Sequence, residues 1–181
     1  PGCPKTPLGL SLMSNYTVSV EFMSDTLYGG HRYRILNVID EGTREALEIT
    51  IATSTSSARL VRVLDNLVAE YGKPKRIRVD NGAEMTSNNF VGWCHENDIE
   101  IIYIQPGKPN QNAYIERFNR SFRTEILDAY IFHTLEQVRE IAWAWRITYN
   151  EERPHQSLGN ITPAEFKRLA TAEIPINQLC A

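Results

Sequence analysis

The order of strand-like and helix-like segments constrains the fold of this chain more than any other feature. Apolar and polar residues alternate over residues 16–23, which predicts a strand. Tyr28-Gly29-Gly30-His31 then predicts a hairpin turn. Further strand-like segments follow at residues 33–39 and 46–52. The chain is therefore predicted to begin with three consecutive strands.

The remaining segments alternate between helix and strand. Apolar residues at helical spacing predict a helix over residues 60–71, which ends at Gly72. Residues 76–79 and 99–104 are strand-like, and residues 88–97 between them are helical. After Asn110 the chain is helical, with capping boxes beginning at Thr134 and Thr162. This order predicts an α/β fold in which a mixed five-stranded sheet is flanked by helices, with additional C-terminal helices.

The length and composition fit one domain of ordinary solubility. A chain of 181 residues, with 42% hydrophobic and 23% charged residues, is long enough for one substantial core. We expect a poorly ordered leader at residues 1–14, a core at residues 15–170 and a C-terminal tail at residues 171–181. No apolar run approaches the roughly 20 residues of a membrane span, so no membrane partner is expected.

Cysteine usage and charge bear on location and partners. Cys3, Cys94 and Cys180 are odd in number and widely spaced, which disfavours a disulfide framework and favours a reducing, cytoplasmic location. The net charge of -3 disfavours tight binding to nucleic acid, although basic residues gather at residues 73–78 and 117–123. The charge therefore predicts that any DNA binding by this core alone is weak.

Two carboxylates, Asp80 and Glu116, occupy positions that suit a metal site. Asp80 directly follows the strand-like residues 77–79 and precedes an Asn-Gly turn, whereas Glu116 lies early in an amphipathic helix. Hard cations take oxygen ligands, and carboxylates at a strand end and on a facing helix suit Mg²⁺ beside a phosphodiester. The simpler interpretation of Glu116 is an exposed helix face on which it pairs with Arg120. The motif around Asp80 favours the metal site.

Helical geometry divides the helix that carries Glu116 into two arcs. At about 100° per residue, one arc is apolar and is expected to face the core: Ile115, Phe118, Phe122 and Ile126. A neighbouring polar arc holds Asn112, Glu116, Arg120 and Arg123. Glu116 is thus expected at the edge of the buried face, within reach of the strand end at Asp80.

Several motifs occur together, in one order, between about residue 15 and residue 166. They are Phe22-Met23-Ser24-Asp25, Asn37-Val38-Ile39-Asp40, Asp80-Asn81-Gly82, Pro106-Gly107-Lys108-Pro109, Glu116-Arg117-Phe118-Asn119, Tyr149-Asn150, Arg153-Pro154-His155 and Thr162-Pro163. With these motifs the chain resembles insertion-sequence transposases whose Asp-Asp-Glu catalytic core is similar to that of retroviral integrases. The resemblance implies the ribonuclease-H-like fold.

The resemblance also implies a function. It implies a polynucleotidyl transferase that cleaves and joins DNA strands in transposition, with Glu21, Asp80 and Glu116 as the catalytic residues and the ligands of two Mg²⁺ or Mn²⁺ ions. DNA contacts are expected at Lys108, Asn112, Arg120 and Arg123. The implied partners are transposon ends, target DNA and further copies of the chain, with association to the nucleoid when bound to DNA. A helix-turn-helix region is expected upstream and is absent from this sequence.

One departure from the family pattern concerns the first ligand. The family begins its first strand with Trp, two residues, Asp and Phe; alignment on Phe22 places Val18 at the Trp and Glu21 at the Asp. Asp25 is a rival, but it lies about 13 Å further along the strand, so Asp25 and Asp40 are expected to be turn or surface acids. Because Glu adds a methylene, we expect an impaired site that works better with Mn²⁺ than with Mg²⁺.

Two other functions remain open. A catalytically inactive transposase remnant, acting only in DNA binding or self-association, would account for Glu21 and for the acidic balance. A ribonuclease-H-type or junction nuclease would share the fold, but it leaves the Pro-Gly-Lys-Pro loop and the Arg153-Pro154-His155 segment unexplained.

Overall fold

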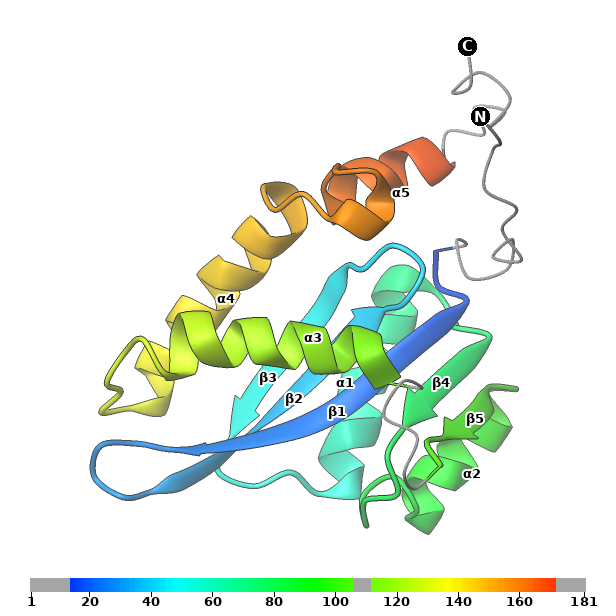
Figure 1. Cartoon of the computed structure of the whole chain (residues 1–181). Helices are drawn as coiled ribbons and strands as arrows, with labels where there is room; N and C mark the ends of the chain where they lie inside the picture. The colour runs from blue at the N-terminus through cyan, green and yellow to red at the C-terminus, as the bar shows by residue number, and fades with distance from the viewer. Residues whose placement is uncertain (1–13, 106–111, 172–181) are drawn as a thin grey trace.

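The computed structural model describes residues 14–105 and 112–171, which form a five-stranded sheet with helices on both faces (Figure 1). The strand order is β3-β2-β1-β4-β5. The first three strands are antiparallel: β1 (Thr17–Thr26), β2 (Arg32–Asp40) and β3 (Ala46–Ala52). The strands β4 (Arg76–Val79) and β5 (Glu100–Tyr103) run parallel to β1. The predicted mixed sheet is confirmed.

The helices form two layers, one on each face of the sheet. One buried cluster joins the sheet to α1 (Ser57–Tyr71) and α2 (Asn88–Glu96). A second cluster, on the opposite face, joins it to α3 (Ala113–Phe122) and α4 (Leu135–Glu151). A short 3₁₀ turn, η3 (Gln156–Leu158), leads to α5 (Pro163–Thr171).

Alternation along β1 decides which face carries which side chain. Val18 and Val20 are buried against α1 and α2, whereas Met23 packs in the cluster on the α3 side. Successive side chains of a strand point to opposite faces, so Glu21 lies on the same face as Met23. The central strand therefore presents Glu21 towards α3.

The predicted apolar arc of α3 is confirmed. Ile115, Phe118 and Phe122 are at most 1% exposed, and the ring of Phe118 packs edge-on against Trp145 and Tyr149 of α4, at centroid distances of 5.3 and 5.0 Å. Contacts of this kind fix the helix on the sheet, because aromatic pairs combine large buried areas with specific geometry.

The end of this helix differs from the prediction. The sequence predicts regular helical spacing through Ile126, but residues Arg123–Leu127 form a π-helical segment, η2. Ile126 stays buried at 5% exposed. A π segment takes more than 3.6 residues per turn, so the direction of Arg123 cannot be read from the helical wheel.

Local signals account for both ends of α1 and for the start of α4. The side chain of Ser56 accepts from Arg59 N at the start of α1, and Gly72 ends that helix with φ of 86°. Thr134 and Gln137 form the predicted capping box at the start of α4. Gly can adopt positive φ without the steric cost that other residues pay, which explains its position after α1.

Some predicted segments lie outside the described residues. These are the leader up to residue 13, the tail from residue 172, and the loop 106–111 with Lys108. Within the described part of the chain, no helix is both long and apolar enough to cross a membrane.

Candidate active site

The sheet register brings Glu21 and Asp80 next to each other. In the parallel pair of β1 and β4, Val20 is the partner of Val79, and these are the residues that precede Glu21 and Asp80. β4 ends at Val79, whereas β1 continues to Thr26. Asp80 therefore begins a loop beside the middle of the central strand, and both side chains are partly buried.

The turn after β4 fixes the carboxylate of Asp80. Gly82 N donates to Asp80 Oδ1 at 2.9 Å, and Asn81 Nδ2 donates to the carbonyl of Ile104 at 2.9 Å. A Cβ atom at residue 82 would lie 2.9 Å from Asp80 Oδ1, which is closer than such atoms approach. Glycine at position 82 thus permits the backbone to approach and hold this carboxylate.

α3 adds two more groups to the same place. Asn112, at the start of the helix and 5% exposed, donates from Nδ2 to Glu21 Oε2 at 3.0 Å. Burial, and to a smaller extent the negative charges of Glu116 and Asp80, together raise the pKa of Glu21 from 4.5 to about 7. The hydrogen bond from Asn112 opposes this shift. The carboxyl group of Glu21 is therefore under the electrostatic influence of both Asp80 and Glu116.

The donor chemistry fits a hard divalent cation. Within residues 14–105 and 112–171, no three His, Cys, Asp or Glu side chains are already close enough to form a complete set of metal ligands. Burial and the negative charges of Glu116 and Asp80 nevertheless favour protonation of Glu21, and a bound cation would instead favour its charged form. Asn112 Oδ1 is a further oxygen there, buried and without a hydrogen-bond partner among the described residues. The residues fit an oxygen-ligated ion better than any apolar ligand.

The raised pKa of Glu21 predicts how metal-free stability depends on pH. The folded protein binds this proton more tightly than the unfolded chain does. The stabilisation of the folded state by protonated Glu21 is therefore fully present below pH 4.5 and is lost as the pH rises through about 7. We expect Glu21→Gln to raise the melting temperature more at about pH 8 than at about pH 5 when measured in a chelator.

The pKa values of Asp40 and Glu45 are also raised, chiefly by burial. Because both residues are present in the native protein and in Glu21→Gln, the difference in melting temperature between these two proteins at one pH reports on Glu21 alone. Glu140→Gln, at an exposed position of α4, controls for the loss of one charge. A melting-temperature difference between Glu21→Gln and the native protein that is the same at both pH values would contradict the prediction.

The two arginines that were predicted to contact DNA, Arg120 and Arg123, have different surroundings. Arg120 is exposed on α3. Arg123 pairs at 3.1 Å with Asp25, which is four residues along β1 from Glu21, and it donates to the Ser24 carbonyl at 3.0 Å. The structure thus bonds Asn112 to Glu21 and places Glu21 within the electrostatic influence of Asp80 and Glu116, and it joins Arg123 to Asp25 at the far end of the strand. Asp40 is a turn acid, but it is 1% exposed and is not a surface acid.

A buried amide pair beside the carboxylates was not predicted. Asn37 lies opposite Glu21 in the β1–β2 register, and its Nδ2 donates to Asn119 Oδ1 at 2.7 Å. Both side chains are buried, and the bond ties α3 to the sheet one turn after Glu116. An Asn inside the apolar run Ile35–Ile39 is the sequence signal that could have indicated such a pair.

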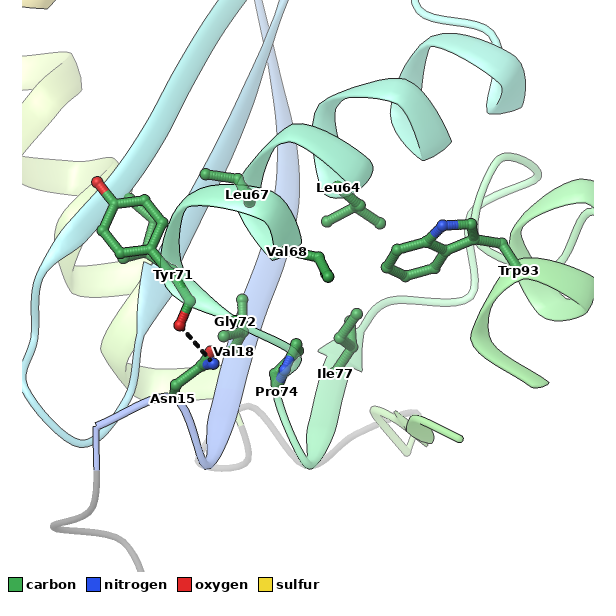
Figure 2. A pocket seen from close by; sticks show the side chains of 11 residues that line it. Asn15, Val18, Leu64, Leu67, Val68, Tyr71, Gly72, Pro74, Ile77 and Trp93 are labelled. Atoms are coloured by element: carbon green, nitrogen blue, oxygen red, sulfur yellow. Dashed lines mark hydrogen bonds between the residues drawn. The ribbon is translucent and has the colours of Figure 1, made fainter. Parts of the chain in front are cut away.

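A small apolar pocket lies on the other face of the sheet. It has a volume of about 20 Å³ and is walled by α1 residues such as Leu64 and Leu67 together with Val18, Ile77 and Trp93 (Figure 2). Because Val18 belongs to the cluster with α1 and α2, this pocket is separated from the carboxylates by the sheet itself. It has room for about one water molecule and carries none of the chemistry of the site.

Comparisons with known proteins find relatives that are encoded by insertion elements. The chain is 44% identical to an uncharacterized 39.2 kDa protein of insertion element IS476 from Xanthomonas euvesicatoria, over 86% of this chain and 45% of that protein. It is 41% identical to an uncharacterized 31.7 kDa protein of insertion element IS407 from Burkholderia multivorans, over 93% of this chain and 61% of that protein. The chain thus spans about half the length of these relatives.

Solved structures show the same fold. The HTLV-2 integrase catalytic core domain in complex with magnesium superposes with a TM-score of 0.65 and 16% identity, over 87% of this chain and 99% of that one. The catalytic core domain of BIV integrase gives a TM-score of 0.64 over 87% of this chain and 97% of that one. These neighbours confirm the ribonuclease-H-like fold. Residues 13–109 and 97–163 each match a family described as integrase core domain, so the chain belongs to the integrase core domain family.

Proposed function

We propose that this chain is the catalytic core of an insertion-sequence transposase that cleaves and joins DNA strands with the help of divalent metal ions. The observation that carries the proposal is the electrostatic coupling of Glu21 with Asp80 and Glu116, three carboxyl groups that come from β1, the end of β4 and α3. Membership of the integrase core domain family and the relatives from two insertion elements support it.

In this proposal each residue has a separate task. Glu21, Asp80 and Glu116 hold two Mg²⁺ or Mn²⁺ ions, and the turn through Gly82 keeps the Asp80 carboxylate oriented. Asn112 positions Glu21 through its hydrogen bond. Such ions supply an activated water or DNA 3′-hydroxyl and stabilise the leaving oxygen. The Asn37–Asn119 pair holds α3, and with it Glu116, against the sheet.

The same proposal names the partners. The substrates are transposon ends and target DNA. Arg120 and Lys108 contact DNA phosphates, while Arg123 does so only after leaving Asp25. α4 exposes Trp143 and Ile147, one turn apart, and this apolar strip suits contact with a second copy of the chain. The helix-turn-helix region of the complete transposase would recognise the element ends.

Nicking of a supercoiled plasmid tests the proposal without knowledge of the element ends. We expect open-circular product in Mn²⁺, less in Mg²⁺, and none when a chelator removes the metal, because every step needs the ions. Gel electrophoresis of the plasmid after incubation with the chain measures this. Nicking that persists unchanged in the chelator would contradict the two-metal function.

A second candidate function has one observation in its favour. Burial and the neighbouring negative charges raise the pKa of Glu21 to about 7, which favours protonation of the first ligand in the metal-free protein. A non-catalytic remnant that only binds DNA or self-associates would have no need of an ionised ligand there. This candidate predicts DNA binding with no nicking in either metal, and also none after Glu21→Asp.

A further inference from the structure

A salt bridge spans the central strand beside the candidate active site. Arg34 of β2 donates from Nη1 to Glu84 Oε1, and Glu84 belongs to the loop that follows β4. In the sheet, β1 lies between β2 and β4 (Figure 1). The salt bridge therefore joins two segments that are not neighbours in the sheet.

The salt bridge crosses β1 at Phe22, the residue after Glu21. The guanidinium of Arg34 lies over the Phe22 ring, with Cζ 4.3 Å from the ring centroid. Phe22 packs with the cluster of α1 and α2, whereas Glu21 points to the opposite face of the strand. The guanidinium is thus held between a ring of β1 and the Glu84 carboxylate, on the face of the sheet that does not carry the Glu21 carboxyl group.

The Glu84 carboxylate also borders the turn that holds Asp80. A Cβ atom added at residue 82 would lie 2.9 Å from Asp80 Oδ1 and 3.6 Å from Glu84 Oε2, so both carboxylates border the same glycine. Oε1 of Glu84 accepts from Arg34, while Oε2 faces Gly82. Glu84 therefore connects the arginine of β2 to the turn of Asp80.

The backbone next to Glu84 is anchored. Met85 is fully buried, its carbonyl accepts from Tyr103 OH at 3.0 Å, and its N–H donates to the Gly82 carbonyl at 3.0 Å. Ser87 Oγ donates to the Glu84 carbonyl at 2.7 Å. Because the loop is bonded on both sides of Glu84, its side chain and the turn of Asp80 are expected to keep a fixed relative position.

Both members of the salt bridge are partly buried and charged. Burial acts to raise the pKa of Glu84, but the hydrogen bond and the positive charge of Arg34 outweigh it and lower that pKa from 4.5. Glu84 is therefore ionised at neutral pH. The two side chains are only 34% and 20% exposed, so water screens this pair less than it screens a fully exposed surface pair.

We propose that Glu84 is a positioning residue of the metal site: its salt bridge with Arg34 fixes the turn of Asp80 relative to β1, and hence relative to Glu21. The proposal rests on the proposed function in taking Asp80 and Glu21 as metal ligands. Arg34 and Glu84 touch no ion in this role. Residues that orient metal ligands without touching the ion typically change metal affinity about 10- to 100-fold when they are replaced.

Calorimetric titration of Mn²⁺ into the chain tests the proposal with two substitutions whose charge effects have opposite signs. Through charge alone, Glu84→Gln would weaken the binding of a cation and Arg34→Gln would strengthen it. Loss of positioning acts in one direction, so we expect each variant to bind Mn²⁺ about tenfold more weakly than the native protein. The double variant Arg34→Gln/Glu84→Gln should bind about as weakly as either single variant, because all three lack the same salt bridge.

Glu125→Gln is the matched control. Glu125 pairs with Arg153 in another partly buried salt bridge, with side chains 37% and 32% exposed, and it lies in η2. Its variant should lose stability, measured as melting temperature in a chelator, without losing affinity for Mn²⁺. A purely structural role of the Arg34–Glu84 pair would instead make Glu84→Gln and Glu125→Gln behave alike in both measurements.

The possible results separate this proposal from the proposed function. Stronger Mn²⁺ binding by Arg34→Gln would show that the pair acts only through its charges, and this overturns the proposal. If the native protein binds Mn²⁺ while Arg34→Gln and Glu84→Gln bind it equally well, the metal site stands and only the positioning role falls. A native protein that binds no Mn²⁺ overturns both, because there is then no ligand to position. Since both single variants are expected to bind more weakly, one of them remains informative if the other is too unstable to measure.

Discussion

Replacing Asp80 by Asn, or Glu116 by Gln, should abolish metal-dependent DNA cleavage while leaving the fold intact. Each substitution keeps the size of the side chain and removes one negative charge from the group that includes Glu21. Loss of a group that merely supports a metal ligand commonly costs about 10- to 100-fold in activity, so loss of a ligand itself should cost at least about 100-fold. Plasmid nicking in Mn²⁺ measures the effect.

Titration of Mn²⁺ by calorimetry separates loss of the metal from loss of the fold. The native protein should bind Mn²⁺ and Asp80→Asn should not, whereas their melting temperatures in a chelator should be similar. Glu96→Gln, at an exposed position of α2, is the control for charge alone and should nick like the native protein. Undiminished nicking by Glu116→Gln would remove Glu116 from the site.

The interaction of these carboxylates was only partly predictable. The sequence shows Asp80 after a strand and Glu116 on a helix, because those positions depend on local periodicity. The β1–β4 pairing that places Glu21 beside Asp80 joins distant parts of the chain and follows from no local signal. The family resemblance, rather than the periodicity, supplied that pairing in advance.

The helix that carries Glu116 shows where helical-wheel reasoning fails. The wheel correctly predicted the buried arc, because regular α-helix extends to Phe122. It also placed Arg123 beside Glu116, but the helix widens into the π segment at Arg123, and the side chain reaches Asp25 instead. Asn112 was predicted as a DNA contact and is buried against Glu21, since its surroundings depend on β1.

The Arg34–Glu84 salt bridge lay beyond sequence reasoning for a similar reason. Arg34 lies in a predicted strand and Glu84 follows the predicted Asn-Gly turn, but nothing local indicates that the two side chains meet. A salt bridge between residues 50 positions apart depends on the strand order that places β1 between β2 and β4. Such long-range juxtapositions require the structure.

Replacing Glu21 by Asp should raise cleavage in Mg²⁺ by about 10- to 100-fold, because a misplacement of about 1 Å can cost on the order of 100-fold in rate. The longer side chain of Glu21 reaches away from the strand and accepts the hydrogen bond of Asn112 at 3.0 Å. The shorter Asp would hold its carboxylate closer to the strand, beside Asp80. Mg²⁺ demands near-ideal octahedral geometry, so the gain should be larger in Mg²⁺ than in Mn²⁺.

The raised pKa of Glu21 also predicts faster cleavage by Glu21→Asp. At neutral pH a metal ion must displace a proton from a carboxyl group whose pKa is about 7, and this weakens binding. In Glu21→Asp, a carboxyl group that is better positioned to coordinate the metal ion would release its proton more readily when the ion binds. Initial nicking rates of the native protein and of Glu21→Asp, each in Mg²⁺ and in Mn²⁺, measure both effects, and Asp25→Asn controls for the neighbouring acid on the same strand.

The ratio of rates in the two metals is the decisive quantity, because it is independent of the amount of active protein. If Glu21 is an imperfectly placed ligand, the ratio of Mg²⁺ to Mn²⁺ rates rises on Glu21→Asp, and it stays unchanged on Asp25→Asn. Equal Mg²⁺ rates for the native protein and Glu21→Asp would show that the extra methylene is accommodated, and the chain is then a fully competent core. If neither protein nicks in either metal, the carboxylates no longer serve catalysis, and the non-catalytic remnant becomes the better account of the chain.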